Sequence, residues 1–172
     1  MRKVLPQKFF NQSALKVAQN LLGKFLVRKL HNRKISLMIT EVEAYDGFKD
    51  KASHASRGKT ERNKIMFGLA GRFYVYFTYG MHWMLNIVTG SKNYPAAVLI
   101  RAAGDINGPA KLTKYLKIDK KFNGSTANRK TGLWFEDRGV KIKKSQIKKS
   151  KRIGVEYAGK WANKHYRFFI SK

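Results

Sequence analysis

Half of the acidic residues of this chain fall in one short stretch, and they are the first candidates for chemistry. The chain has 172 residues, with 37 Lys plus Arg against 10 Asp plus Glu, and a formal net charge of +27. A protein so poor in carboxylates has little reason to cluster them unless a site needs a base. The acids of this cluster are Glu41, Glu43, Asp46, Asp50 and Glu61.

The segment ISLMITEVEAY, residues 35–45, carries two of these acids and predicts a strand because it is apolar and β-branched. Alternate side chains of a strand share a face, so we expect Ile39, Glu41, Glu43 and Tyr45 on the same side. If that face meets the core, desolvation raises the pKa of a glutamate there and makes it a candidate general base. The alternative is a strand that emerges into solvent after Ile39 and leaves both glutamates exposed, and the pattern alone leaves both open.

The most aromatic stretch, residues 73–83, predicts two strands around a turn at Tyr79-Gly80. Aromatic strands usually belong to a core, but here both faces are aromatic and one core cannot absorb both. At the tip of a hairpin on a basic surface, Tyr79 is placed to enter a DNA duplex as a wedge. Rings that face the strand of Glu43 are placed to stack on an extruded base.

The composition restricts the partners and the cofactors. A compact body with so much positive charge favours a polyanion, either nucleic acid or an anionic membrane, although a lysine-rich codon bias explains part of the excess. No run of about 18 apolar residues and no apolar N-terminal segment is present, so we expect neither a membrane span nor a signal peptide, and a cytoplasmic protein. The chain has no cysteine, and its four histidines lack paired ligand spacing, so we expect no metal and no cofactor.

Further elements must position these segments. The length and the 43% hydrophobic content predict one domain, residues 1–172. Helices are predicted to begin at Ser13, ending before Gly23, and at Pro109. The predicted strands cover residues 25–30, 35–45, two runs within 72–90, and 96–102, and short connections favour antiparallel pairing. Residues 46–66 are predicted to form a loop, the basic run 140–152 a solvated loop or edge strand, and residues 154–170 the closing segment.

Several separate motifs resemble the alkyladenine DNA glycosylase family, the 3-methyladenine or methylpurine DNA glycosylases. In the order of the family, they are LLGKFLVRK, TEVEAYDG, ASHASRGKTERN, MFGLAGRFYVYFTYGMHWMLNIV, AAVLIRA, NGPAKL and RIGVEYAGKWA, and they run from about residue 14 to 170. The resemblance implies an α+β single domain with a curved, mainly antiparallel sheet flanked by α-helices, like a formyltransferase C-terminal domain. It also implies a monomer that removes damaged purines from double-stranded DNA in base excision repair, associated with the nucleoid if the source is bacterial.

The same resemblance implies how the bond to the purine is broken. Glu43 would activate the attacking water, and Arg101 would hold that water and the carboxylate together with a backbone carbonyl at or near Ile153. Cleavage of the N-glycosidic bond develops oxocarbenium character on the sugar, which one carboxylate can stabilise while it orients water. No second acid is needed where the base itself is a good leaving group.

The resemblance implies further roles for side chains around the flipped base. Tyr45, His54 and Tyr76 would form stacking walls, and Asn86 would crowd the exocyclic amino group of normal guanine. Tyr79 would fill the space that the flipped nucleotide leaves in the duplex. Alkylated purines that carry positive charge would be attracted by the tyrosine rings.

The contacts to the DNA backbone and the type of reaction are less well determined by the sequence. Arg62, Lys111 and the lysines of the 141–151 run are the candidates for phosphate contacts. Glu61 stands where family members often have Pro, so the range of lesions stays open. Two alternatives remain at this point: a basic nucleic-acid-binding protein without catalysis, and a bifunctional glycosylase/lyase that uses a lysine Schiff base.

Overall fold

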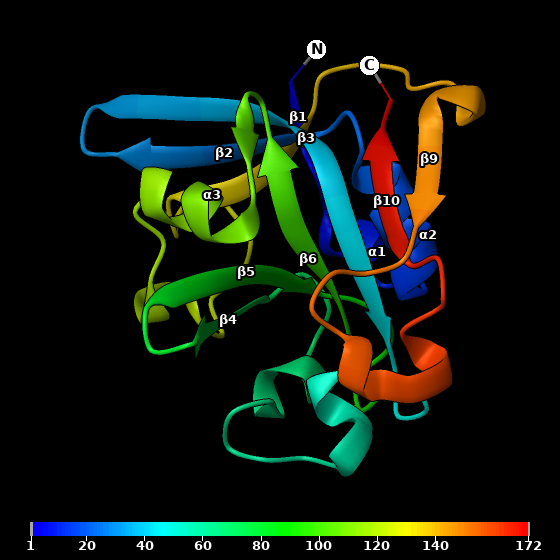
Figure 1. Ribbon diagram of the computed structural model, residues 1–172. Coiled ribbons are helices and arrows are strands. Elements are labelled where there is room, and N and C mark those ends of the chain that lie inside the picture. Colours follow the sequence, from blue (N-terminus) through cyan, green and yellow to red (C-terminus); the bar gives the residue numbers. More distant parts are fainter. Residues whose placement is uncertain (1, 172) are drawn as a thin grey trace.

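The computed structural model describes residues 2–171, and its centre is a ten-stranded sheet whose strand pairs are antiparallel (Figure 1). Three short strands lie off the main path: β10 (Arg167–Ile170) pairs with β3 (Arg33–Asp46) and with β9 (Ile147–Ser150), and β7 (Ile106–Asn107) pairs with β6 (Ala96–Ala103). The predicted class, α+β with a mainly antiparallel sheet, is confirmed. The main path runs β1 (Lys3–Val4), β8 (Leu133–Asp137), β2 (Phe25–Leu30), β3 (Arg33–Asp46), β6 (Ala96–Ala103), β5 (His82–Val88) and β4 (Phe73–Thr78).

Few helices cover this sheet. At the start of α2 (Ala14–Leu21) the side chain of Ser13 accepts a hydrogen bond from the Lys16 N–H at 3.4 Å, and Gly23 follows the helix with φ +79°, as the capping pattern predicts. One face of α2 enters the core through Ala14, Val17, Ala18 and Leu21. The α-helices are α1 (Gln7–Phe10), α2 (Ala14–Leu21) and α3 (Pro109–Tyr115). The 3-10 turns are η1 (His54–Arg57), η2 (Lys64–Phe67), η3 (Lys120–Phe122), η4 (Lys144–Gln146) and η5 (Glu156–Trp161). The first lies inside the predicted 46–66 loop, and the second begins in it and ends one residue beyond it.

The long strand β3 changes its buried face partway along. Ile39, Val42 and Ala44 are all fully buried in the main core, so the step from Ile39 to Val42 is three residues instead of two. The pairing with β6 is irregular on both sides of Glu41. The expectation that Ile39 shares a face with Glu41 and Glu43 is therefore wrong, because one odd step moves the later side chains to the opposite face. Glu43 consequently points away from the main core.

The aromatic hairpin β4–β5 has two buried faces. Phe73 belongs to the main core with Leu85 and Ile87. The neighbouring Tyr74 belongs to a second, smaller cluster on the opposite face, against which Tyr76 packs. Two apolar clusters thus absorb the two aromatic faces, and the second cluster borders the candidate site.

The C-terminal segment completes the sheet beside β3. Strand β10 pairs with β3 in the register Arg167↔Glu43, and β9 pairs with β10 as an edge strand, in agreement with one of the two predictions for the basic run. Arg152, the last residue of that run, is buried and only 4% exposed, so the prediction of a solvated run is wrong at this position. Its guanidinium is neutralised by a buried carboxylate, which the charge pattern did not reveal. Across residues 2–171, no helix has the length and apolar character needed to cross a membrane.

Candidate active site

A cavity of about 250 Å³ lies on the face of the sheet opposite the main core. Strands β3, β5 and β6 form its floor, the β4–β5 hairpin forms one wall, and the segment after β9 forms the other. The predicted site residues that line it come from segments far apart in the sequence: Glu43, Tyr45, His54, Tyr76, Tyr79, Asn86, Arg101 and Ile153. The cavity is close to the lower end of the ~300–1,000 Å³ range of small-molecule sites.

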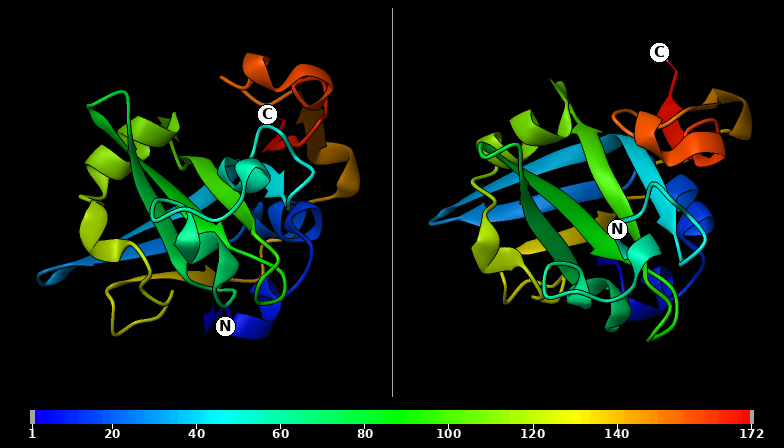
Figure 2. Two further views of the ribbon diagram at one scale, coloured as in Figure 1. Left: turned by 90° about the horizontal axis from the view of Figure 1, so that it is seen from below. Right: turned by 60° about the horizontal axis from the view of Figure 1, so that its bottom comes forward.

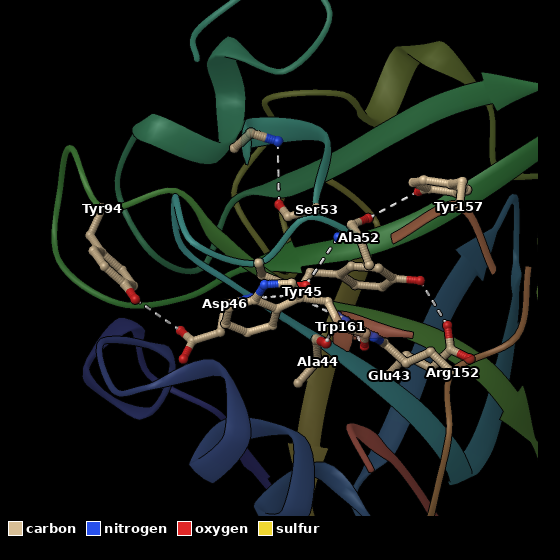
Figure 3. Close-up of polar contacts among 12 residues, drawn as sticks. Glu43, Ala44, Tyr45, Asp46, Ala52, Ser53, Tyr94, Arg152, Tyr157 and Trp161 are labelled. Atoms are coloured by element: carbon tan, nitrogen blue, oxygen red, sulfur yellow. Dashed lines mark hydrogen bonds and ion pairs between the residues drawn. The ribbon is translucent and has the colours of Figure 1, made fainter. Parts of the chain in front are cut away.

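The carboxylate of Glu43 is fully buried and held from three directions. Figure 3 draws one of these contacts, the one with Tyr45. Its Oε1 accepts a hydrogen bond from the Ile153 N–H at 2.9 Å and lies 3.3 Å from Arg101 Nη1. Its Oε2 accepts a hydrogen bond from the Tyr45 hydroxyl at 2.9 Å. These contacts leave the carboxylate one orientation, so its reactive edge is fixed before a substrate enters. Ile153 contacts Glu43 through its N–H, and the contact of its carbonyl with a water stays a prediction.

Burial gives Glu43 a higher proton affinity than an ordinary glutamate. Desolvation raises its pKa, and the opposing effects are smaller: the charge of Arg101, then the Ile153 N–H and the Tyr45 hydroxyl. The net direction is upward from the usual value. A carboxylate whose pKa is raised is a better proton acceptor than an ordinary one, so Glu43 is suited to accept a proton from water.

Arg101 is shared between the two glutamates of β3. Its Nε lies 2.9 Å from Glu41 Oε1, and its Nη1 reaches Glu43. Arg167 from β10 also binds Glu41 Oε1, at 3.1 Å. Glu41 therefore anchors the arginine that approaches Glu43, a role that the sequence pattern did not separate from that of Glu43. The two partners of Glu41, Arg101 and Arg167, lie on β6 and β10, and no local pattern around residue 41 indicates them.

The aromatic wall is built from His54 and two tyrosines on one face of β4. His54 Nδ1 lies 2.9 Å from the Tyr74 hydroxyl, and its ring meets the Tyr76 ring edge-on at 4.6 Å between centroids. Although His54 is exposed at the mouth of the cavity, partial burial and the charge of Arg62 lower its pKa to about 4. The imidazole is therefore neutral near pH 7 and offers no positive charge. The prediction missed Tyr74, which alternation with Tyr76 along β4 would have placed on the same face.

A buried ion pair supports the opposite wall. Both guanidinium Nη atoms of Arg152 bind the carboxylate of Asp50, with Nη2 at 2.7 Å from Oδ1. Arg152 also donates hydrogen bonds to the carbonyls of Ala44 and Trp161, at 2.8 and 3.3 Å. Its Cζ lies 4.8 Å from the centroid of the Tyr45 ring, which places a cation behind this cavity wall. Neither Asp50 nor Arg152 was predicted as a site residue, because a buried pair 102 residues apart leaves no local signal.

The remaining predicted residues occupy distinct places. Asn86 is buried in β5, and its Nδ2 donates a hydrogen bond to the Tyr74 carbonyl at 3.1 Å, which fixes the amide at the cavity. Tyr79 lies at the hairpin tip with φ +52° and is 80% exposed. Arg62 lies outside the cavity, where it donates to the Phe77 carbonyl at 3.1 Å and covers the Tyr76 ring at 5.2 Å. Lys111 is an exposed residue of α3 that does not line the cavity.

A metal site needs several ligating side chains close together. Within the described part of the chain, residues 2–171, no group of three or more His, Asp or Glu side chains is arranged to hold a metal ion. Glu43 instead contacts Tyr45 and Arg101, and His54 contacts Tyr74. The arrangement offers one buried carboxylate, a nearby guanidinium and a cavity with aromatic walls, a combination suited to hydrolysis of a bond to a flat ring.

Comparisons with known proteins agree with this chemistry. A family model described as methylpurine-DNA glycosylase (MPG) matches residues 8–106 and 104–172. A protein of Methanocella arvoryzae with the name "Putative 3-methyladenine DNA glycosylase" is 43% identical, over 96% of this chain and 92% of its own length. Proteins with the same name from Borreliella afzelii and Legionella pneumophila are 43% and 41% identical, over 94% and 99% of this chain and 93% and 95% of theirs.

Proposed function

Because the chain belongs to the methylpurine-DNA glycosylase family, we propose that it removes damaged purines from duplex DNA with a water molecule activated by Glu43. The enzyme is a DNA glycosylase, a hydrolase of N-glycosyl bonds that acts in DNA repair. The purines proposed as substrates are the alkylated and deaminated bases of the 3-methyladenine, hypoxanthine and ethenoadenine class. The product is an abasic site in the DNA.

The burial of Glu43 at the floor of the cavity is the observation that carries the proposal. Its side chain is 0% exposed, and the mouth of the cavity is bordered by the exposed Tyr79. A base stacked inside a duplex cannot reach such a carboxylate, so the target nucleotide must leave the helix. Tyr79 at the hairpin tip then fills the gap in the stack, as wedge side chains do in other proteins that distort DNA.

The reaction follows from the position of the carboxylate. As the bond between C1′ and the purine breaks, positive charge develops on the sugar, and ionised Glu43 stabilises it. A water held by Glu43 attacks C1′ and gives its proton to the carboxylate, while Arg101 limits the movement of both. A purine that is already a cation departs as a neutral base with its bonding electron pair, and no acid is required for that departure.

The walls of the cavity favour a cationic purine over a normal one. Tyr45 and Tyr76 present electron-rich rings, and such contacts contribute about 0.5–2 kcal/mol to the binding of a cation. The low pKa of His54 keeps a competing positive charge out of the wall near pH 7. Asn86, held by its hydrogen bond to the Tyr74 carbonyl, is placed to oppose the exocyclic amino group of guanine.

A simple hydrolytic route also fits the lining of the cavity better than a lyase route. Of the lining residues, which all belong to the described part of the chain, none is a lysine that could form a Schiff base with the sugar. Treatment with borohydride during turnover tests this directly. We expect no covalent adduct between protein and DNA, and a trapped adduct would overturn the hydrolytic assignment.

The proposed function is tested by single-turnover excision on duplexes that each carry one lesion: a methylated purine, hypoxanthine or ethenoadenine. We expect cleavage of at least one of them and a loss on the order of 10²–10⁴-fold in Glu43→Gln. Glu61→Gln is the matched control, because Glu61 belongs to the same acidic cluster but is exposed and, among residues 2–171, forms an ion pair only with Lys64. A folded wild-type protein that excises none of the lesions would refute the proposal.

A further inference from the structure

A second concavity, a groove of about 630 Å³, lies beside the active-site cavity. One side is the loop that leads into η1, and the other side is η5; both lie at the bottom of the view in Figure 1, and Figure 2 shows them from below. Its aromatic members are Phe48, Tyr157 and Trp161. The reaction proposed above uses none of these side chains.

The charged residues of this groove are all cations. Lys49, Lys51, Arg57 and Lys160 line it, and no Asp or Glu does. In the described range 2–171, none of these four has a carboxylate within 4 Å. Free cations along a concave wall concentrate positive potential, and that potential favours a chain of phosphates over a single anion.

The aromatic side chains are held in place and keep accessible surface. Tyr157 is 69% exposed, yet its hydroxyl donates a hydrogen bond to the Ala52 carbonyl at 3.2 Å. Phe48 is 50% exposed and packs edge-on against Phe67 and Tyr94 at 5.9 and 6.1 Å between centroids. Fixed rings combined with cations form the usual surface for an unpaired nucleic-acid strand.

Tyr157 connects the groove to the active site. It lines the cavity that holds Glu43, and it also lines the groove. A strand whose nucleotide is inserted in the cavity must leave it over this side chain or on the opposite side, along the β4–β5 hairpin. We propose that the groove binds the lesion strand immediately to one side of the flipped nucleotide, with its phosphates on the cations and a sugar or base against Phe48 and Tyr157. This inference rests on the proposed function, because it takes the flipped nucleotide as its starting point.

The test compares Lys51→Gln/Lys160→Gln with wild type. Both substitutions keep a polar side chain and remove one charge each. Binding is measured at several salt concentrations on a duplex with a tetrahydrofuran abasic analogue, together with single-turnover excision from a lesion duplex. We expect the log–log salt slope to fall by about 2, since each phosphate contact contributes about 0.9. The excision rate at saturating enzyme stays within about twofold of wild type, because the chemistry lies in the cavity.

The control is Lys29→Gln/Lys34→Gln. These two lysines face each other at the outer end of the β2–β3 hairpin, at the top left of Figure 1 and far from the groove. This variant loses the same charge from an exposed position, so it reports how much the net charge alone contributes. We expect its salt slope to remain within about 0.5 of the wild-type value.

Neutral methylphosphonates in the lesion strand locate the contact. They are placed on each side of the lesion in turn, and we expect them to weaken wild-type binding on both sides. For the groove variant, Lys51→Gln/Lys160→Gln, we expect almost no loss of binding on one side, the side whose phosphates lie in the groove, and the wild-type loss on the other. Equal losses for wild type and the groove variant on both sides, or a salt slope equal to that of the control variant, would overturn the inference. Failure of the proposed function has a different signature: the wild type excises no lesion, although its binding to the abasic analogue still reports on the groove.

Discussion

The Cζ of Arg152 lies 4.8 Å from the centroid of the Tyr45 ring, on a guanidinium that also forms a buried ion pair with Asp50. The hydroxyl of Tyr45 in turn donates a hydrogen bond to Glu43. The orientation of the proposed base therefore depends on a cation that touches neither the cavity nor the substrate. Arg152 is a positioning residue in this sense, and its neighbour Ile153 supplies a further hydrogen bond to Glu43.

Replacement of Arg152 by methionine is expected to destabilise the protein by about 3–5 kcal/mol, because it leaves Asp50 as an uncompensated buried charge. Urea unfolding followed by circular dichroism measures the loss. Lys151→Met is the control, since that side chain is exposed and adjacent in the sequence. The double variant Asp50→Asn/Arg152→Met is expected to recover part of the stability; if it is less stable than the single variant, the ion-pair explanation is wrong.

Glu43→Gln is expected to raise the free energy of unfolding at pH 7 while it lowers the excision rate. The pKa of Glu43 is higher in the folded than in the unfolded protein, so the folded state loses stability as pH rises from the unfolded value to the folded value. Glutamine keeps the shape without the buried charge. Urea unfolding at pH 7 and near pH 4 tests the sign, since the gain should shrink at the lower pH, and a variant less stable than wild type at pH 7 would contradict it.

The acidic limb of the pH–rate profile, where the excision rate falls at low pH, is expected to follow the protonation of Glu43. Arg101 lowers the pKa of Glu43, so Arg101→Gln should move this limb to higher pH. Arg101→Lys keeps the charge and should leave the limb close to its wild-type position. His54, with its pKa lowered to about 4, stays neutral above that pH and does not set the limb. Single-turnover rates between about pH 4.5 and 8 measure the shift, and a limb that stays in place in Arg101→Gln would count against the assignment.

Tyr79→Ala is expected to lower single-turnover excision by about tenfold or more, because the extruded nucleotide loses the side chain that replaces it in the stack. A flipping cost of a few kcal/mol corresponds to that factor at about 1.4 kcal/mol per tenfold. Stability should change by less than about 0.5 kcal/mol, since the ring is 80% exposed. Met81→Ala, at a neighbouring position that is 65% exposed, is the control and should excise at close to the wild-type rate.

The sequence indicated the strands and turns better than the contacts between segments that are far apart along the chain. Alternating apolar residues and turn residues predicted the strands around Glu43 and the hairpin with Tyr79, because those signals are local. The eight residues predicted for catalysis, base binding and intercalation do line one cavity. Their proximity could be expected only from motifs that resemble a family, since no periodicity places Ile153 beside Glu43.

The errors have a common physical origin. The irregular pairing around Glu41 reverses the face of β3, and backbone pairing with β6 produces it without a signal in the side-chain pattern. Arg152 is indistinguishable by composition from the exposed lysines before it, yet Asp50 makes its burial possible. In both cases the deciding contact is made by a segment far away in the sequence.

The pairing of β10 with β3 also ties the candidate site to one edge of the sheet. Arg152, Ile153 and Arg167 all come from the segment around β9 and β10, and they contact Asp50, Glu43 and Glu41. Where that segment is not docked, Glu43 has neither its N–H donor nor the support behind Tyr45. Local opening of this edge therefore releases the proposed base while the main core stays folded.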